Sequence, residues 1–237
     1  MTDAAPIRVV VADDQPLIRA SFTTLINSAA DLCVVGQAGT GDEVLDVVRD
    51  TGVDVVLMDI RMPGLDGLTA TRRMTADPAL SAVRILILTT FEIDEYVFTA
   101  LRNGASGFLG KSAEPDDLLA AIRIVHRGDA LLTPTATRSL VTRYLAWPER
   151  PELISDSRLS YLTSRERQIL GLVAAGLSND DIAGHLTLSP HTVKTHVNRT
   201  MTKLHARDRA QLVIIAYETG ITPPRPVGIA AARANHR

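Results

Sequence analysis

The sequence predicts two domains of different fold class, an α/β domain with a parallel sheet and then a smaller all-α domain. Short apolar runs alternate with amphipathic stretches through the first 127 residues, which is typical of βα units. After about residue 160, apolar residues recur at the spacing of helix faces. A chain of 237 residues is long enough for two domains, each with its own core.

Five strands and five helices are expected in the first domain. The strand candidates are the apolar runs at 7–12, 32–37, 53–58, 83–88 and 106–109. The helix candidates are the amphipathic stretches at 16–29, 41–50, 66–76, 94–103 and 115–127. Pro16 and Pro115 suit the first turn of a helix, and Asn103-Gly104 suits a helix end. Five such units form a parallel sheet with helices on both faces.

Four helices are expected in the second domain. Thr163 and Glu166 have the spacing of a capping box at the start of the first helix, which Gly176 ends. A second helix begins at Ser178. Ser189 caps a third helix that continues to Leu204. Its buried stripe is expected to consist of Val193, Val197, Met201 and Leu204. The last helix runs from Arg209 to Glu218.

The N-terminal and C-terminal parts of the chain differ in net charge. Residues 1–130 contain 19 acidic and 11 basic residues, a net charge of −8, within a chain of net charge −2. Residues 131–237 contain 8 acidic and 14 basic residues, a net charge of +6. Two domains with different partners explain this division, and chance segregation of solvated charge is the alternative.

The sequence indicates a cytoplasmic protein. No apolar run approaches the roughly 18 residues of a membrane span, and the first residues lack the pattern of a signal peptide. Cys33 is the single cysteine, so it forms no internal disulfide, which agrees with a reducing compartment.

Polar side chains follow four strands of the predicted sheet. They are Asp13, Asp14, Asp59, Thr89 and Lys111. Because functional groups of an open α/β sheet gather outside the carboxyl ends of its strands, we expect these five to share one crevice. Three acids, a hydroxyl and an amine there indicate a divalent cation and a phosphoryl group.

The order and spacing of these five residues, with Met62-Pro63-Gly64 after Asp59, resemble the receiver domain of two-component response regulators, a flavodoxin-like (βα)5 fold. The resemblance implies that a histidine kinase phosphorylates Asp59, with Thr89 and Lys111 on the phosphoryl oxygens. It implies that Asp14, Asp59 and the backbone carbonyl of Arg61 hold Mg²⁺, while Asp13 acts largely through a bound water. It also makes Thr89 and Phe108 a switch pair, although Phe108 is equally an ordinary core residue.

The second domain resembles the helix-turn-helix of the LuxR and NarL/FixJ type. The segments that carry this resemblance are Leu162 to Arg167, Gly176 to Asn179, Asp181 to Ala183 and Thr192 to Val197. It implies that Lys194, Thr195 and Asn198 approach base edges of double-stranded DNA. It implies that Thr192, Arg199 and Lys203 approach phosphates, and that the last helix pairs two subunits on promoter half-sites.

We therefore expect a transcriptional response regulator that acts as a homodimer, not an enzyme. The regions are a receiver at 1–130, a linker at 131–160 with a helix from Thr133 to Ala146, a helix-turn-helix domain at 161–220 and a mobile tail at 221–237. A stand-alone phosphotransfer phosphatase is one alternative. The other is a DNA-binding regulator independent of phosphorylation, whose receiver serves dimerisation or ligand sensing.

The resemblance to receivers also implies that the side chains two residues beyond Asp59 and two beyond Thr89 overlook the path of a hydrolytic water. They are Arg61 and Phe91. Arg61 can hold phosphoryl oxygens and Phe91 can block the water, which predicts slow loss of phosphate. The alternative places Arg61 in solvent and Phe91 under a helix.

Overall fold

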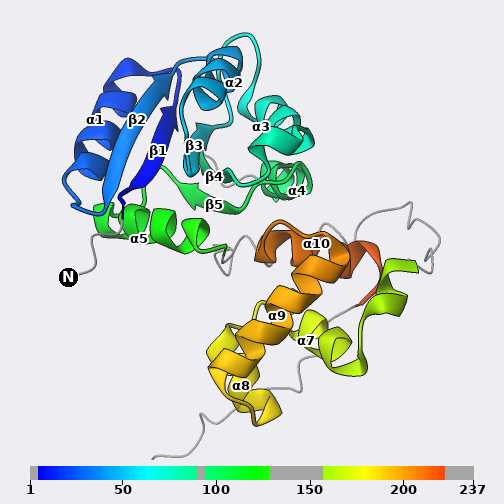
Figure 1. The fold of residues 1–237 in the computed structure, drawn as a ribbon. Helices are drawn as coiled ribbons and strands as arrows, with labels where there is room; N and C mark the ends of the chain where they lie inside the picture. The colour runs from blue at the N-terminus through cyan, green and yellow to red at the C-terminus, as the bar shows by residue number, and fades with distance from the viewer. Residues whose placement is uncertain (1–4, 90–93, 129–156, 222–237) are drawn as a thin grey trace, which may run out of the picture. The chain divides into compact units, whose positions relative to one another are not determined.

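The computed structural model describes residues 5–89, 94–128 and 157–221, which divide into two compact units (Figure 1). One unit contains the elements from β1 to α5, and the other contains η2, α7, α8, α9 and most of α10. No described helix has the length and hydrophobicity that a membrane crossing requires. The predicted helix from Thr133 to Ala146, most of the linker and nearly all of the tail lie outside the described residues.

The first unit is built on one five-stranded sheet. All strands are parallel, in the order β2-β1-β3-β4-β5. The strands are β1 Ile7–Ala12, β2 Leu32–Ala38, β3 Val55–Asp59, β4 Arg84–Thr89 and β5 Gly107–Gly110. The helices are α1 Pro16–Asn27, α2 Gly41–Asp50, α3 Gly67–Ala76, η1 Pro78–Leu80, α4 Asp94–Arg102 and α5 Pro115–His126. The predicted fold class is confirmed, and the predicted ends of these strands and helices differ by at most two residues.

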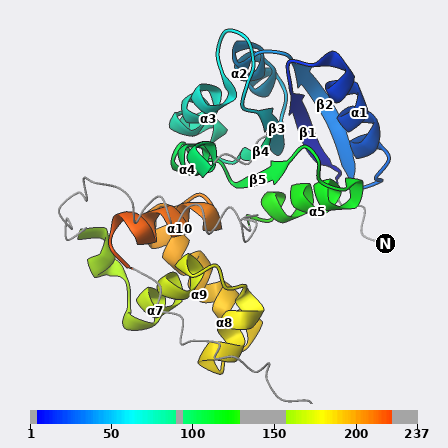
Figure 2. The same cartoon turned by 180° about the vertical axis from the view of Figure 1, so that it is seen from behind.

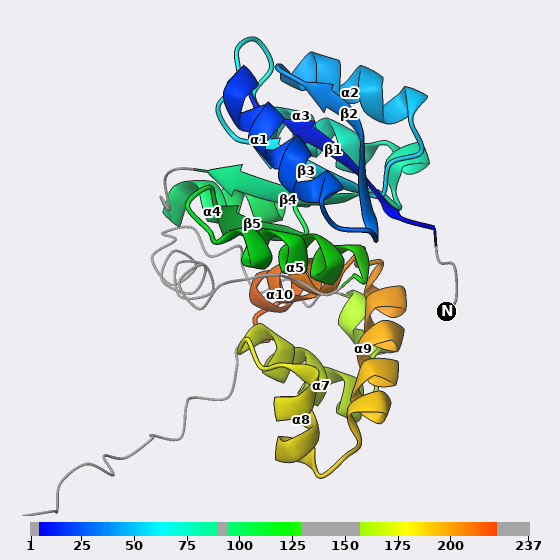
Figure 3. The same cartoon turned by 90° about the vertical axis from the view of Figure 1, so that its left-hand side faces the viewer.

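Helices cover both faces of this sheet, with α1 and α5 on one and α2, α3 and α4 on the other (Figures 1 and 3). On the first face, Val11 and Leu57 belong to a core cluster with Ile26 of α1 and Ile122 of α5. The intervening strand residues, such as Val56, are equally buried. Burial on both faces is the reason that these strands read as continuous apolar runs.

The second unit is helical, with α7 and α8 packed against α9 (Figure 2). Its elements are η2 Ser157–Tyr161, α7 Ser164–Ala174, α8 Asn179–Leu186, α9 Pro190–Leu204 and α10 Arg209–Glu218. Thr163 and Glu166 form the predicted capping box, and Ser178 forms another with Asp181. Ser189 caps α9 by accepting a hydrogen bond from the Thr192 amide at 3.1 Å. The hydroxyl of Tyr217 donates to Ala174 O at 3.1 Å and joins α10 to α7.

The buried stripe of α9 differs from the prediction at one position. Val193, Val197 and Leu204 are buried as expected, but the fourth buried residue is Thr200, and Met201 is half-exposed. The Thr200 hydroxyl donates to His196 O at 2.8 Å, so its burial leaves no unsatisfied donor. Counting only apolar side chains therefore placed Met201 wrongly in the stripe.

Candidate functional site

The predicted polar residues come together at the carboxyl ends of the strands. Lys111, just after β5, has its Nζ 2.6 Å from Asp13 Oδ2 and 2.9 Å from Asp59 Oδ2. The backbone amide of Lys111 also donates to Thr89 O at 2.8 Å, which aligns the ends of β4 and β5. Carboxylate oxygens of Asp13, Asp14 and Asp59 lie within 4.8 Å of one another. Side chains that are far apart in the sequence thus form one polar cluster.

Asp59 is a buried carboxylate of this cluster that is held on both of its oxygens. It is the last residue of β3 and is 6% exposed. Its Oδ1 accepts a hydrogen bond from the Ile60 amide at 2.8 Å, and its Oδ2 faces Lys111. Burial raises the pKa of the Asp59 carboxyl, and the hydrogen bond from Lys111 opposes this rise without cancelling it. The carboxylate is oriented by bonds to both of its oxygens.

The charge of the cluster suits a divalent cation. Burial acts to lower the pKa of the Lys111 amine, but hydrogen bonds to Asp13 and Asp59 outweigh it and raise the pKa. Lys111 therefore carries a positive charge, yet the three carboxylates outnumber this single ammonium. Mg²⁺ prefers hard oxygen ligands and keeps several waters, so a few carboxylates at this spacing fit it.

Gly67 closes the loop that follows Asp59. Its amide donates to Ile60 O at 2.9 Å, and a Cβ at this position would collide with the carbonyl oxygen of Asp59. Asp66 caps α3 by accepting from the Thr69 amide at 2.7 Å. The first turn of α3 thereby packs directly against the end of β3 and fixes the backbone beside the acceptor.

The side chain of Arg61 contacts α4. Its Nη2 donates to the hydroxyl of Tyr96 at 3.0 Å, and the guanidinium carbon lies 5.7 Å from the centroid of the Tyr96 ring. Arg61 is exposed, as the alternative expects, but its guanidinium also contacts Tyr96. No sequence pattern pointed to Tyr96. Phe91, the other residue predicted to slow the loss of phosphate, lies outside the described residues.

The expected switch residues occupy adjacent strands. Thr89 is 5% exposed at the end of β4, and Phe108 is 2% exposed in β5, where it is paired with Ile87. The Phe108 ring lies in the core, which is the position that either role requires. The switch role of this pair stays a prediction.

The second unit presents α9 as a polar surface. Lys194, Asn198 and Arg199 are exposed, and Thr192 and Thr195 are half-exposed. The Thr195 hydroxyl donates to His191 O at 3.0 Å, so it meets other groups as an acceptor. These residues lie opposite the buried stripe of α9, as a helix presented to DNA requires.

Lys203 differs from the other predicted contacts because it has a partner in the fold. Its Nζ lies 2.7 Å from Glu166 Oε2, and the Glu166 side chain is only 4% exposed. Glu166 also accepts from the amide and the hydroxyl of Thr163, at 2.8 and 3.0 Å. The sequence identified Glu166 as a capping residue but not as the partner of Lys203. This ion pair joins the start of α7 to the end of α9.

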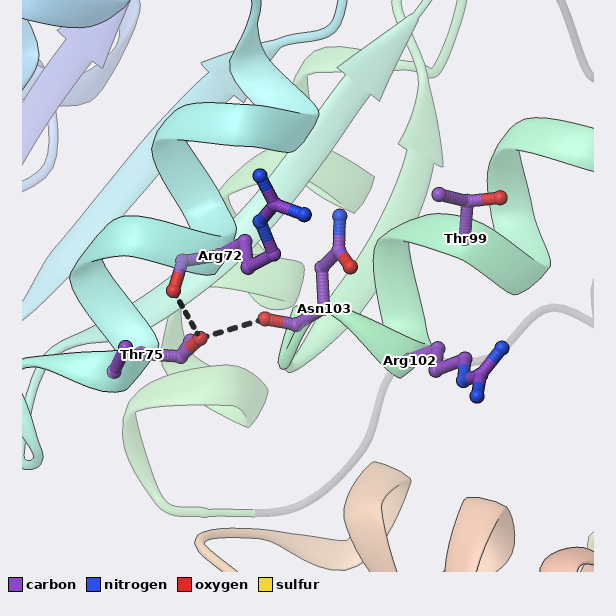
Figure 4. Close-up of a pocket in the computed structure, with 6 residues that line it drawn as sticks. Arg72, Thr75, Thr99, Arg102 and Asn103 are labelled. Carbon is purple, nitrogen blue, oxygen red and sulfur yellow. Dashed lines mark hydrogen bonds between the residues drawn. The ribbon is translucent and has the colours of Figure 1, made fainter.

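A separate pocket of about 490 Å³ lies between α3 and α4 (Figure 4). Its lining includes Arg72, Thr75, Arg102 and Asn103, and the Thr75 hydroxyl bridges to Arg72 O and Asn103 O. Both helices end here, so the pocket lies at the opposite edge of the sheet from Asp59. Arginines at helix C-terminal ends are the expected partners of the helix dipoles.

Comparison with known proteins divides the chain into the same two domains. Residues 9–123 match the family model of the response regulator receiver domain, and residues 160–216 match that of the bacterial regulatory proteins of the luxR family. The chain is 41% identical over 216 residues to the uncharacterized transcriptional regulatory protein YxjL of Bacillus subtilis, covering 91% of this chain and 97% of that protein. It is 38% identical over 208 residues to the oxygen regulatory protein NreC of Staphylococcus aureus, covering 87% of this chain and 95% of NreC.

A solved structure agrees with these matches. The response regulator ChrA, of a heme-sensing two-component system, is 32% identical with a TM-score of 0.50, covering 92% of this chain and all of ChrA. The acidic cluster around Asp59 lies within the receiver match, and α9 lies within the luxR match. The chain therefore belongs to the two-component response regulators that join a receiver domain to a LuxR-type DNA-binding domain and regulate transcription.

Proposed function

We propose that Asp59 accepts a phosphoryl group from a histidine kinase and that this modification controls binding of promoter DNA by a dimer. The observation that carries the proposal is the Lys111 ammonium, which bridges Asp13 and Asp59 beside Asp14. An acceptor carboxylate, a charge partner and further acids are the groups that transfer of a phosphoryl group to a carboxylate needs.

The transfer forms one bond and breaks another. A carboxylate oxygen of Asp59 attacks the phosphorus of the kinase phosphohistidine, the phosphorus–nitrogen bond breaks, and the histidine leaves with its electron pair and takes up a proton. Lys111 stays beside the acceptor and offsets the charge on the phosphoryl oxygens. Thr89, at the neighbouring strand end, is the proposed hydrogen-bond donor to the same group.

Asp14, Asp59 and the carbonyl of Arg61 are the proposed ligands of Mg²⁺, and Asp13 is proposed to act through a bound water. The metal would reduce the repulsion between the acceptor carboxylate and the incoming phosphoryl group. Asp14 suits direct ligation because it is exposed at the mouth of the cluster, whereas Asp13 is buried against Lys111.

The proposed DNA contacts lie on α9. Lys194, Thr195 and Asn198 are assigned to base edges, and Thr192 and Arg199 to phosphates. Lys203 is assigned to phosphates as well, although its bond to Glu166 gives it a second role. The helix α10 is the proposed pairing surface, with half-sites about one helical turn apart.

We assign the receiver to residues 1–130, the linker to 131–160, the DNA-binding domain to 161–220 and the tail to 221–237. A protein with these partners would work in the cytoplasm, where its kinase domain and promoter DNA are found.

Phosphorylation tests the proposal directly. The full chain is incubated with acetyl phosphate and Mg²⁺, and its intact mass is measured. We expect one added phosphate, none after chelation of the metal and none in Asp59→Asn. Asp46→Asn is the matched control, because Asp46 is an exposed carboxylate on α2, and it should label as the native chain does. Persistent labelling of Asp59→Asn would show that another residue is the acceptor.

A further inference from the structure

The contact between Arg61 and Tyr96 links the loop after Asp59 to α4. Arg61 donates to the Tyr96 hydroxyl at 3.0 Å and lies over its ring. Tyr96 is the third residue of α4, the helix that follows β4 and Thr89. A single side chain thus joins the acceptor loop to a helix on the surface of the receiver.

The backbone of Arg61 is held close to the acceptor while its side chain extends away. Asp59 Oδ1 accepts from the Ile60 amide, and Ile60 O accepts from the Gly67 amide. The first turn of α3 packs directly on the Asp59 carbonyl at Gly67, where a Cβ would not fit. The long, exposed side chain of Arg61 is therefore the part of this loop that can change partners.

Phosphorylation of Asp59 would give the Arg61 guanidinium a second possible partner, which would bind it more strongly than Tyr96 does. The phenol of Tyr96 is neutral, so it offers one ordinary hydrogen bond and a cation–π contact at an exposed site. A phosphoryl group two residues away offers two or more anionic oxygens to the planar guanidinium, and such charge-assisted bonds are about twice as strong as neutral ones. Lys111 is already placed between Asp13 and Asp59, so Arg61 can add a second positive charge.

We infer that Arg61 exchanges Tyr96 for the phosphoryl group of Asp59, which releases Tyr96 and the start of α4 when the receiver is phosphorylated. This inference rests on the proposed function, since it requires a phosphoryl group on Asp59. The exchange would let a change of charge at Asp59 alter the surface at α4. In the phosphorylated receiver, Arg61 would also shield the phosphoryl group from water.

Tyrosine NMR signals of the full chain test the exchange. Tyr96 is the single tyrosine among residues 1–130, and the chain has 4 in all, so carbon-13 labelling of tyrosine gives few signals and Tyr96→Phe assigns one. Arg61→Ala is expected to shift the Tyr96 signal in the unphosphorylated chain. Arg73→Ala, which removes an exposed arginine of α3 that pairs with Asp42, should leave it in place.

Acetyl phosphate and Mg²⁺ are then added to the native chain, and intact mass is read on the same sample. The Tyr96 signal should move toward its position in Arg61→Ala. A chain that carries the phosphate but keeps the original Tyr96 signal would overturn the inference and leave the proposed function intact. A chain that takes up no phosphate would overturn both.

The lifetime of the phosphate gives a second reading. Hydrolysis adds water to phosphorus, breaks the bond to Asp59 and yields inorganic phosphate, the Asp59 carboxylate and a proton. Arg61→Ala should shorten the lifetime by about tenfold, the size of one lost charge-assisted hydrogen bond. Tyr96→Ala removes the competing partner and should lengthen it by about twofold. Tyr161→Phe, in the DNA-binding domain, is the control. A shorter or unchanged lifetime in Tyr96→Ala would refute the exchange.

Discussion

Replacing Lys203 by alanine is expected to destabilise the DNA-binding domain by about 1–2 kcal/mol. The Glu166 carboxylate, whose side chain is 4% exposed in the native chain, would lose its 2.7 Å bond to Lys203. Breaking a fully buried ion pair costs about 3–5 kcal/mol. Two features reduce this figure: Lys203 is 34% exposed, and two bonds from Thr163 still reach Glu166. Lys203→Ala thus weakens the fold as well as any contact to phosphate.

Urea unfolding of the full chain, with hydrogen exchange read on peptides of α7 and α9, measures this loss. Lys194→Ala is the matched control, because Lys194 is an exposed lysine of the same helix. Faster exchange in α7 and α9 is expected in Lys203→Ala alone. Exchange equal to that of the native chain would refute the stabilising role and leave Lys203 as a phosphate contact only.

The same pair has a defined dependence on pH. Burial acts to raise the pKa of Glu166, but bonds from Lys203 and Thr163 outweigh it and hold the pKa below its ordinary value of 4.5. A carboxyl whose pKa is lowered by folding stabilises the fold above its unfolded pKa, and this contribution is lost as the pH falls through the folded pKa. The difference in stability between the native chain and Lys203→Ala should therefore be full at neutral pH and vanish in acid.

Four further substitutions test metal binding, the backbone beside Asp59 and DNA recognition. Asp14→Asn should raise the Mg²⁺ concentration needed for phosphorylation with little change in the unfolding midpoint, and an unchanged requirement would remove Asp14 from the ligands. Gly67→Ala should cost about 1–3 kcal/mol of stability through the collision with the Asp59 carbonyl, and native stability would show that the loop can relax. Lys194→Ala and Asn198→Ala should each cost about 1–3 kcal/mol of binding free energy on the preferred DNA sequence and relax the base preference at one position. If each variant selects the same DNA sequence from a random pool as the native chain does, base recognition lies elsewhere.

The fold was predictable because the strands of the receiver are buried on both faces and therefore appear as continuous apolar runs. The acidic cluster was predictable for a related reason: parallel strands end at one edge, so Asp13, Asp59 and Lys111 had to meet there. Caps such as Ser189 follow from local sequence alone, because their hydrogen bonds span three residues.

Contacts between side chains of different elements were not predictable in the same way. The Arg61–Tyr96 contact and the Glu166–Lys203 pair join residues 35 and 37 positions apart, and no periodicity relates their positions. Thr200 was missed in the stripe of α9 because a threonine is suited to burial only once its hydroxyl has a partner, here His196 O.

The affinity of the full chain for DNA selected from a random pool, measured with and without acetyl phosphate and Mg²⁺, tests the central claim most directly. We expect phosphorylation to raise the affinity of the native chain by about tenfold or more, within the usual range of coupling between two sites. Asp59→Asn should show no increase. Equal affinity of the phosphorylated and unphosphorylated native chain would contradict control by Asp59 and would favour a regulator whose receiver serves only dimerisation or ligand sensing.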